Sequence, residues 1–257
     1  MKHPFQNEYF SRNSGLISEE QQERLSNSSV LVAGVGADGG LLAERLVRFG
    51  IGKIILADPE KFEAANINRQ FAAYQKNFGR NKAECVANEL IQINPALKIE
   101  VLNDGLHSGN IGKMVYAADV VADEIEYSLP AISVMLHREA RTQNKFVFMG
   151  ANVGWGASIF CFSPSGKTFE EEFEYNEENT SINPLRYLKE APSYLGEEML
   201  ASVVSGSAPV PALSSSVSLV AACMANEIIL FILGKRKPLI VPQFLSIDLF
   251  DLTLSKI

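Results

Sequence analysis

The amino-acid sequence predicts an α/β fold: a Rossmann-like, doubly wound mixed sheet, with a parallel N-terminal part and antiparallel C-terminal strands. Three observations lead to this prediction. Short apolar runs alternate with stretches of helical periodicity from residue 29 to residue 150, which is typical of parallel strands joined by helical crossovers. A glycine-rich turn joins the first apolar run directly to a helical stretch. Beyond residue 150, the run 157–162 has the pattern of an antiparallel strand.

The elements follow one another in a regular order up to residue 150. Residues 1–28 are expected to form an N-terminal helical arm, because 15–26 has the pattern of a short amphipathic helix. The patterns then predict strands at 29–33, 54–57, 98–102, 119–122 and 146–149, and helices at 41–49, 82–93, 109–117 and 130–143. Residues 29–150 should therefore form a compact half built around the glycine-rich turn.

The pattern changes in the rest of the chain. Residues 163–212 form a long, poorly periodic segment with an acidic run, EEEFEYNEE, at 170–178. We interpret this segment as an acidic crossover insertion with a solvent-exposed acidic run, because structureless connections of this length are uncommon. A long apolar helix at 213–233 and a final strand or hairpin at 244–254 follow. Residues 213–257 thus return to the core, so we expect 1–257 to be a single domain.

Composition narrows the possible functions. The 257 residues carry 23 basic and 30 acidic side chains, a net charge of −7, which argues against nucleic acid as the main partner. The N-terminus lacks the apolar run of a signal peptide, and three cysteines are too few for a disulfide framework, so we expect a cytoplasmic protein. The apolar stretch 217–233 is interrupted by Asn226 and Glu227, which favours a buried helix over a membrane span.

The glycine-rich turn predicts a nucleotide site. Gly34, Gly36 and Gly39 form a G-x-G-x-x-G pattern between a strand and a helix, where backbone N–H groups and the helix dipole favour phosphate. About 20 residues later, Asp58 ends the second strand, where a carboxylate can bind ribose hydroxyls. Residues 29–150 are therefore interpreted as the nucleotide-binding half. Asp38 would repel a phosphate, so either its side chain points away or the phosphates lie elsewhere.

Two cations beyond the glycine-rich turn indicate which nucleotide is bound. Arg69 follows Asp58 closely, and Lys82 opens the next predicted helix. Hydride transfer from a dinucleotide has no general need for these charges, whereas a triphosphate must be neutralised during phosphoryl or nucleotidyl transfer. A NAD- or FAD-dependent oxidoreductase therefore remains a less favoured alternative.

The ordered motifs resemble the ThiF/MoeB superfamily of adenylating enzymes, which are of the ubiquitin-activating type. The matching features, in chain order, are YFSRN at 9–13, the glycine loop at 34–39, Asp58, NINRQ at 66–70, GRNK at 79–82, and the late helix with ANE at 225–227. The glycine loop alone would be weak evidence. The order and number of the matches make the resemblance specific, and it extends over nearly the whole chain.

This resemblance implies that MgATP adenylates a carboxylate and that pyrophosphate is released. Asp58 would hold the ribose, and Asn66, Arg69 and Lys82 would contact the phosphates. Gln70 would support the site. Arg12 would reach the triphosphate from the other subunit of a homodimer. The acyl substrate would be the C-terminus of a ubiquitin-like protein or a small carboxylic acid, and no membrane would be involved.

Several positions depart from the family pattern. The family usually has D-x-T-D-N where this chain has DEIEY at 123–127, so Glu126, with Asp123, would help to hold Mg²⁺. Tyr9 replaces the first family arginine, and Asp38 stands where the family has a small or apolar residue. These departures motivate a second hypothesis, that the chain is a non-catalytic nucleotide-binding or pairing relative.

The cysteines limit the mechanism. Relatives that form a thioester or a persulfide use a cysteine in the crossover segment, but residues 163–222 contain none. Cys85, Cys161 and Cys223 lie in apolar patterns typical of packing, and the paired C-x-x-C motifs of zinc-binding relatives are missing. We therefore expect no zinc and no internal thioester, so that a separate nucleophile completes the reaction.

Overall fold

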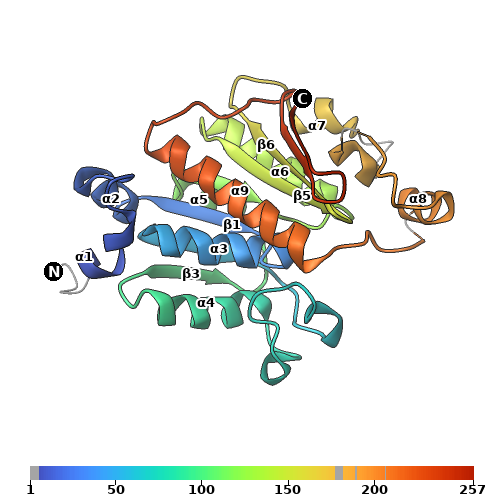
Figure 1. The fold of residues 1–257 in the computed structure, drawn as a ribbon. Coiled ribbons are helices and arrows are strands. Elements are labelled where there is room, and N and C mark those ends of the chain that lie inside the picture. Colours follow the sequence, from blue (N-terminus) through green and yellow to red (C-terminus); the bar gives the residue numbers. More distant parts are fainter. Residues whose placement is uncertain (1–5, 177–181, 189, 206) are drawn as a thin grey trace.

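All the strands of the structure lie in one sheet. The structure, a computed structural model, describes residues 6–176, 182–188, 190–205 and 207–257 (Figure 1). Within these residues the sheet has eight strands in the order β3-β2-β1-β4-β5-β6-β7-β8. Their bounds are β1 Ser29–Ala33, β2 Lys53–Ala57, β3 Lys98–Leu102, β4 Val120–Asp123, β5 Val147–Val153, β6 Gly156–Phe162, β7 Leu245–Asp248 and β8 Thr253–Lys256.

The pairing of neighbouring strands changes once across the sheet, from parallel to antiparallel. Strands β3, β2, β1, β4 and β5 are parallel neighbours, whereas β6, β7 and β8 continue from β5 in antiparallel pairs. Buried parallel strands are expected to be uniformly apolar, as SVLVA in β1 and KIILA in β2 are after their first residue. The predicted mixed sheet, parallel and then antiparallel, is confirmed.

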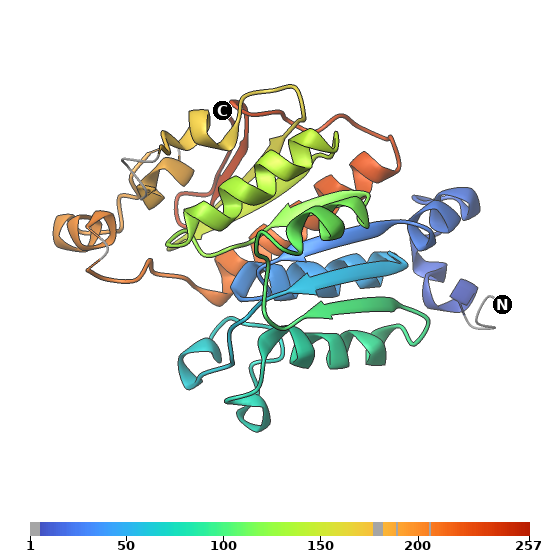
Figure 2. The same ribbon diagram turned by 180° about the vertical axis from the view of Figure 1, so that it is seen from behind.

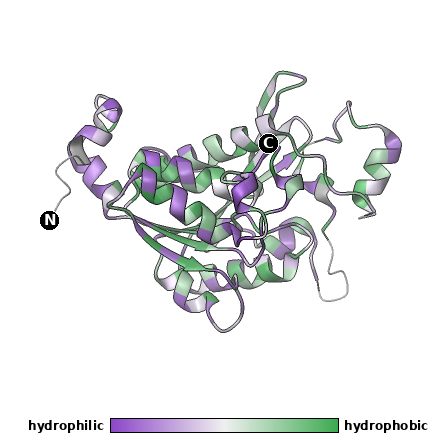
Figure 3. Ribbon diagram, turned by 90° about the horizontal axis from the view of Figure 1, so that it is seen from below, coloured by the Kyte–Doolittle hydropathy of each residue, from purple (hydrophilic) through white to green (hydrophobic). Residues whose placement is uncertain are grey.

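Helices cover both faces of the sheet and enclose two apolar cores (Figures 1 and 2). On one face lie α3 (Ala37–Phe49), α4 (Lys82–Ile93) and α9 (Ser214–Ile232). On the other lie α5 (Ile111–Tyr116), α6 (Pro130–Thr142) and α7 (Phe169–Phe173). Colouring by hydropathy shows the apolar strands between helices whose outward surfaces are more hydrophilic (Figure 3). This arrangement leaves the two ends of the sheet free for loops.

Helix α9 is a core helix of this fold. By length and composition alone it could cross a membrane, and half of its most apolar window is buried inside the structure. It packs along α3 and against β5 and β6. Met224 and Ile228, on the buried face of α9, are fully inaccessible to solvent. Its apolar character therefore has a packing explanation within the molecule.

The acidic crossover segment carries more regular structure than the sequence patterns suggested. It contains α7, a 3₁₀ turn at Pro184–Tyr187 and α8 (Glu197–Val204). Thr168 and Glu171 form a capping box at the start of α7, and the acidic run supplies three glutamates to its first turn, where the helix dipole favours negative charge. Glu170 also pairs with Arg138 at 2.7 Å. The run is thus partly a helix start, although its residues 177 and 178 lie outside the described ranges.

The N-terminal arm and the crossover loops lie at opposite ends of the sheet. The arm comprises α1 (Gln6–Tyr9), a 3₁₀ turn (Ser11–Asn13) and α2 (Glu19–Ser26), which begins after the capping residue Ser18. It precedes β1 and therefore lies at the amino end of the parallel strands (Figure 1). The loops after the strands gather at the other end, where ligands bind in open α/β sheets.

Candidate active site

A cavity of about 370 Å³ opens at the carboxyl ends of the parallel strands. Its walls come from the loops that follow β1, β2 and β4, from the end of β5, and from the segment before α9. Of the predicted site residues, the lining includes Gly34, Gly36, Asp58, Arg69, Gln70, Lys82 and Glu126. Most of the residues singled out from motifs far apart in sequence therefore meet in one place.

The glycine loop is shaped by close backbone packing and leaves room in the cavity. Gly34 has φ +86°, and a Cβ there would lie 2.1 Å from the carbonyl oxygen of Glu124. A Cβ at Gly39 would lie 2.0 Å from the Gly34 carbonyl oxygen. At Gly36, by contrast, the nearest atom to such a Cβ is Gln70 Nε2 at 3.9 Å. Gly34 and Gly39 thus serve packing, whereas Gly36 keeps open the space that a ligand would occupy.

Asp58 joins two of the loops that form the cavity. Its Oδ2 accepts a hydrogen bond from the Val35 N–H at 2.7 Å, and its Oδ1 accepts one from the Glu60 N–H at 2.8 Å. Burial raises the pKa of Asp58, while these two hydrogen bonds and the Lys82 charge oppose that rise. A carboxylate has further lone pairs, so Asp58 can hold both loops and still accept from a ribose hydroxyl.

Positively and negatively charged side chains lie together in the part of the cavity near Asp58. The Lys82 side chain is only 6% exposed, and its Nζ lies 2.5 Å from Oε2 of the exposed Glu60. Burial and the charge of Glu60 raise the pKa of Glu126, whereas Lys82 and Arg69 oppose that rise. The buried ammonium of Lys82 is thus paired with a carboxylate that can turn to solvent.

Arg69 and Gln70 bring polar atoms without partners into the lining. Arg69 Nη1 donates to the Ala65 carbonyl at 3.1 Å and to Asn68 Oδ1 at 2.8 Å. Within the described part of the chain, the buried atoms Arg69 Nε and Gln70 Oε1 have no hydrogen-bond partner. Since unpaired buried polar atoms are costly, this part of the cavity is suited to a polar ligand.

Asn66 points away from the cavity. Its Oδ1 accepts from the Glu63 N–H at 2.9 Å, in a cap of the short 3₁₀ turn Ala64–Asn66. The structure therefore does not bring Asn66 together with Arg69 and Lys82, and its predicted contact with phosphate would require the side chain to leave this cap.

Asp123 is also absent from the cavity lining. Its Oδ2 lies 3.0 Å from His137 Nε2, and its Oδ1 accepts from Ser133 Oγ at 3.2 Å, both on α6. The expected pairing of Asp123 with Glu126 around Mg²⁺ is thus not the arrangement seen, because Asp123 instead anchors the end of β4 to α6. Sequence reasoning assigned nothing to His137, which lies outside every motif.

Arg12 lies far from the cavity within one chain. It is exposed on the N-terminal arm, at the amino end of β1, whereas the cavity is at the carboxyl end. Only a second chain could bring an Arg12 to this cavity, so its predicted role stays a prediction about a dimer.

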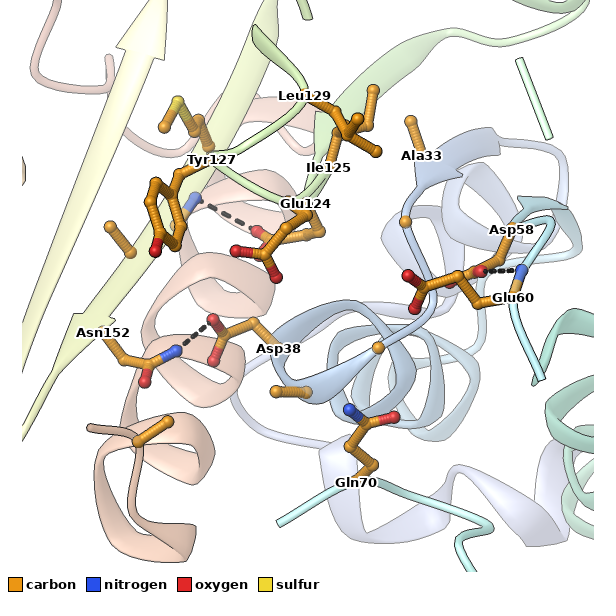
Figure 4. A pocket seen from close by; sticks show the side chains of 18 of the residues that line it. Ala33, Asp38, Asp58, Glu60, Gln70, Glu124, Ile125, Tyr127, Leu129 and Asn152 are labelled. Carbon is orange, nitrogen blue, oxygen red and sulfur yellow. Dashed lines mark hydrogen bonds between the residues drawn. The ribbon is translucent and has the colours of Figure 1, made fainter. Parts of the chain in front are cut away.

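Three side chains form an acidic group that sequence reasoning did not assemble. Asp38, on α3, accepts a hydrogen bond at its Oδ2 from Asn152 Nδ2 at 2.5 Å. Glu124, after β4, accepts one at its Oε1 from the Gly150 N–H at 3.0 Å. Figure 4 shows this group on one side of the pocket and Asp58 with Glu60 on the other. Asp38 thus lines the cavity on the side away from Asp58, and the prediction that it avoids the phosphates stays a prediction.

The two acids of this group hold their protons unusually strongly. Burial raises the pKa of Asp38 to about 7, against the opposing hydrogen bond from Asn152 and the charge of Arg69. Burial and the neighbouring Asp38 raise the pKa of Glu124 well above its ordinary value. A signal was present in the sequence, since both acids lie just beyond neighbouring parallel strands.

Comparison with known protein families shows which family this chain belongs to. The model of the ThiF family matches residues 10–257. The chain belongs to the ThiF family. This confirms the resemblance drawn from the motifs and covers the cavity, the sheet and α9 together.

Individual ThiF relatives match over shorter stretches. Ubiquitin-like modifier-activating enzyme 5 of Caenorhabditis elegans is 47% identical over 90 residues, which are 35% of this chain and 20% of that protein. The tRNA threonylcarbamoyladenosine dehydratase of Bacillus subtilis is 34% identical over 120 residues, 47% of this chain and 43% of that protein. A probable molybdopterin-synthase adenylyltransferase of Porphyra purpurea is 27% identical over 168 residues, 65% and 43% of the two lengths. The matches thus span less than half of each of these relatives.

Solved structures share the fold. PaaA superposes with a TM-score of 0.73 at 19% identity, covering 99% of this chain and 74% of that one. Escherichia coli MccB, solved with ATP, gives a TM-score of 0.69 at 18% identity, covering 92% of this chain and 64% of that one. At such identities the likeness establishes a common ThiF fold.

The cysteines of this ThiF chain are all remote from the cavity lining. Cys85 and Cys161 are buried, and Cys223 is partly buried. Burial raises the pKa of each thiol, which lowers the fraction of nucleophilic thiolate. Among the described residues there is no group of three or more His, Cys, Asp or Glu side chains that could hold a metal ion.

Substituting the glycines of the loop separates packing from ligand space. Gly39→Ala should lower the free energy of unfolding by about 3 kcal/mol or more, because its Cβ would overlap backbone. Gly36→Ala should cost clearly less stability yet weaken ATP binding at least about tenfold, because its methyl group enters the cavity. Urea unfolding and calorimetric ATP titration of both variants measure this. Equal destabilisation, or unchanged ATP affinity in Gly36→Ala, would contradict the assignment.

The raised pKa of Asp38 predicts a pH-dependent cost to stability. A carboxyl with a higher pKa in the folded state than its ordinary 3.8 stabilises the fold at low pH, and this contribution is lost as pH rises through about 7. Between pH 5 and pH 8, Asp38→Asn should therefore gain about 1–2 kcal/mol in free energy of unfolding relative to the unsubstituted protein. Urea titrations at the two pH values test this, with Asp251→Asn as the exposed control. A difference that stays constant with pH would show that Asp38 ionises normally.

Proposed function

We propose that this protein uses MgATP to adenylate a carboxylate, giving an acyl-adenylate and pyrophosphate, with no internal thioester. The observation that carries the proposal is the meeting of Asp58, Arg69 and Lys82 in one cavity at the carboxyl ends of the strands of a ThiF fold. It is supported by relatives named as an adenylyltransferase and a modifier-activating enzyme, and by the structure of MccB with ATP.

The reaction requires positioning and charge neutralisation. One oxygen of the substrate carboxylate attacks the α-phosphorus of ATP, a P–O bond forms there, and the bond to the oxygen bridging the α- and β-phosphorus atoms breaks as pyrophosphate leaves. A carboxylate is ionised at neutral pH, so no general base is needed. The cations of the cavity fit the charge that develops on the leaving pyrophosphate.

Each lining residue has a role that follows from its place. Asp58 accepts hydrogen bonds from the ribose, since its carboxylate is fixed by two backbone donors. Arg69 turns its unpartnered Nε and its guanidinium toward phosphate oxygens, and Gln70 supports the same wall. Lys82 exchanges its contact with Glu60 for the triphosphate, because the ammonium is held at the cavity surface and the exposed Glu60 carboxylate is free to turn toward a magnesium ion.

The residues present fit a magnesium ion. Glu126 and Glu60 are oxygen donors on the cavity wall near Lys82, and Mg²⁺ in nucleotide sites takes one or two protein carboxylates, with phosphate oxygens and water as its other ligands. Mg²⁺ would lower the charge of the triphosphate and orient it. Glu60 replaces Asp123 in this proposal, because Asp123 is engaged with α6.

Arg12 completes the site in a homodimer. Its exposed position on the arm, distant from the cavity of its own chain, suits a residue that serves the partner's cavity. An arginine contributed in this way adds a charge that offsets the transition state only when the dimer is assembled. The trans role follows from the family resemblance, and the geometry of one chain agrees with it.

The acyl substrate is the C-terminus of a ubiquitin-like protein or a small carboxylic acid. The names of two relatives mention a ubiquitin-like modifier and a tRNA, so a group on tRNA is a third class. The net charge of −7 disfavours a tRNA-bound group, since RNA binding draws on basic surface. Remote, protonated cysteines leave the final acyl transfer to a separate nucleophile. We place the protein in the cytoplasm. The competing oxidoreductase proposal leaves Arg69 and Lys82 without a role.

ATP binding tests the proposal directly. Arg69→Ala should weaken the binding of MgATP by about 10- to 100-fold, because a charge-assisted hydrogen bond contributes about 1.5–3 kcal/mol. Arg80→Ala is the matched control: it removes an exposed arginine that bonds to Asn77 and does not line the cavity. Isothermal calorimetry measures the MgATP affinity of both variants, and exchange of labelled pyrophosphate into ATP measures the adenylation step.

Several outcomes would count against the proposal. Equal ATP affinity in Arg69→Ala and Arg80→Ala would contradict the assigned phosphate site. ATP binding without AMP or pyrophosphate formation for any carboxylic acid would favour a non-catalytic relative. A mixture of Arg12→Ala and Arg69→Ala chains should regain activity that neither has alone, and no recovery would exclude the role of Arg12 across a dimer.

A further inference from the structure

The acidic group of Asp38, Glu124 and Asn152 is not used by the proposed ATP site. It lies in the same cavity but on the side away from Asp58 and Glu60 (Figure 4). The carboxyl ends of β4 and β5 and the first turn of α3 bring the three side chains together. This side is therefore left for the second substrate, which must approach the α-phosphate from within the cavity.

The hydrogen bonding of this group shows what it lacks. Asn152 donates its Nδ2 to Asp38, which fixes the amide and turns its Oδ1 the other way. Among the residues that the structure describes, no donor reaches the buried atoms Asp38 Oδ1 and Asn152 Oδ1. Both unpartnered atoms are acceptors, and two carboxyl groups lie beside them. These two atoms thus need hydrogen-bond donors, which an ammonium group can supply and a carboxylate anion cannot.

A plain carboxylate would enter this side of the cavity unfavourably. Burial already disfavours the ionised forms of Asp38 and Glu124, and a further carboxylate would disfavour them more, in a place where screening by water is reduced. An ammonium group near the carboxylate of the substrate makes its entry favourable, since this group carries up to three N–H donors and one positive charge. Such a group could donate to the two orphaned oxygens.

We propose that Asp38, Glu124 and Asn152 form a subsite for an ammonium group carried by the acyl substrate close to its reacting carboxylate. This proposal rests on the proposed adenylation and specifies its substrate class. The ammonium belongs either to a free amino acid or to a basic side chain near the C-terminus of a peptide. The side of the cavity with Asp58 and Lys82 holds ATP, and the acidic side selects the acid that is activated.

Pyrophosphate exchange with matched pairs of acids tests the subsite. One arm compares a pool of common amino acids with the same skeletons lacking the ammonium group. A second arm compares peptides ending Lys-Gly with peptides ending norleucine-Gly. Exchange should be at least about tenfold faster with the ammonium-bearing member of the arm that contains the true substrate. The two arms distinguish an amino acid from a peptide.

Substitutions in the acidic group test whether it is the source of the preference for an ammonium-bearing acid. The double substitution Asp38→Asn with Glu124→Gln should abolish the preference for the ammonium-bearing acid while leaving the KM for ATP within about twofold. The pair Glu19→Gln and Glu20→Gln on exposed α2 removes the same charge far from the cavity and should change neither quantity. Asn152→Ala, which keeps both carboxylates, should reduce the preference for the ammonium-bearing acid. This variant replaces the double variant in the test if the double variant does not fold.

The proposal is overturned by equal exchange with both members of every pair or by faster exchange with the neutral acids. No exchange with any acid while ATP still binds would instead contradict the adenylation proposal on which it rests. Titration with Mg²⁺ alone gives a further test, since metal binding that disappears in Asp38→Asn would make the group a cation site instead. A protein that binds no ATP at all would contradict the adenylation proposal as well, which distinguishes the two failures.

Discussion

The buried carboxylate of Asp58 holds the candidate site together. One of its oxygens accepts from the backbone of the loop after β1, and the other from the loop after β2. This bridge is possible because β1 and β2 are parallel and in register, with Ala33 opposite Ala57, so both loops begin at the same level. β4 continues the register, with Asp123 beside Ala33, and this places the loop that carries Glu124 and Glu126 against Gly34.

From this arrangement the cavity acquires two sides of different character. The side near Asp58 contains Lys82 and Arg69, whose charges are balanced in the ligand-free protein by Glu60 and Glu126. The other side contains Asp38 and Glu124, two acids with no basic side chain bonded to either. Adenylation needs a triphosphate and a carboxylic acid in one cavity without mutual repulsion. The separation of basic and acidic side chains allows both substrates to bind together if the acid carries its own cation.

The sequence predicted the regular elements well because their periodicity is strong. The helix at 82–93 and the strand at 98–102 have the expected bounds, and the alternation of apolar runs was enough to predict the mixed sheet. The short helices of the crossover were missed, since five or eight residues give little periodicity. The spacing of Thr168 and Glu171 was a capping signal that would have indicated α7.

The site was predictable only where a motif determines both the residue type and the direction in which its side chain points. Asp58 directly follows β2 and Lys82 begins α4, so both reach the cavity at the carboxyl edge of the sheet, and Arg69 lies on the loop between these two elements. Asn66 and Asp123 belong to the same motifs, yet local bonds turn them away, one into a cap and the other toward His137. The acidic group required knowledge of tertiary contacts, because Asp38 and Asn152 are 114 residues apart.

A crystal structure of the protein with Mg²⁺ and a non-hydrolysable ATP analogue tests the central claim most directly. The account predicts the ribose hydroxyls on Asp58, the triphosphate on Arg69 and Lys82 with Glu60 displaced, and the side of Asp38 and Glu124 left open beside the α-phosphate. A triphosphate lying against Asp38 and Glu124, or a nucleotide bound outside this cavity, would contradict it.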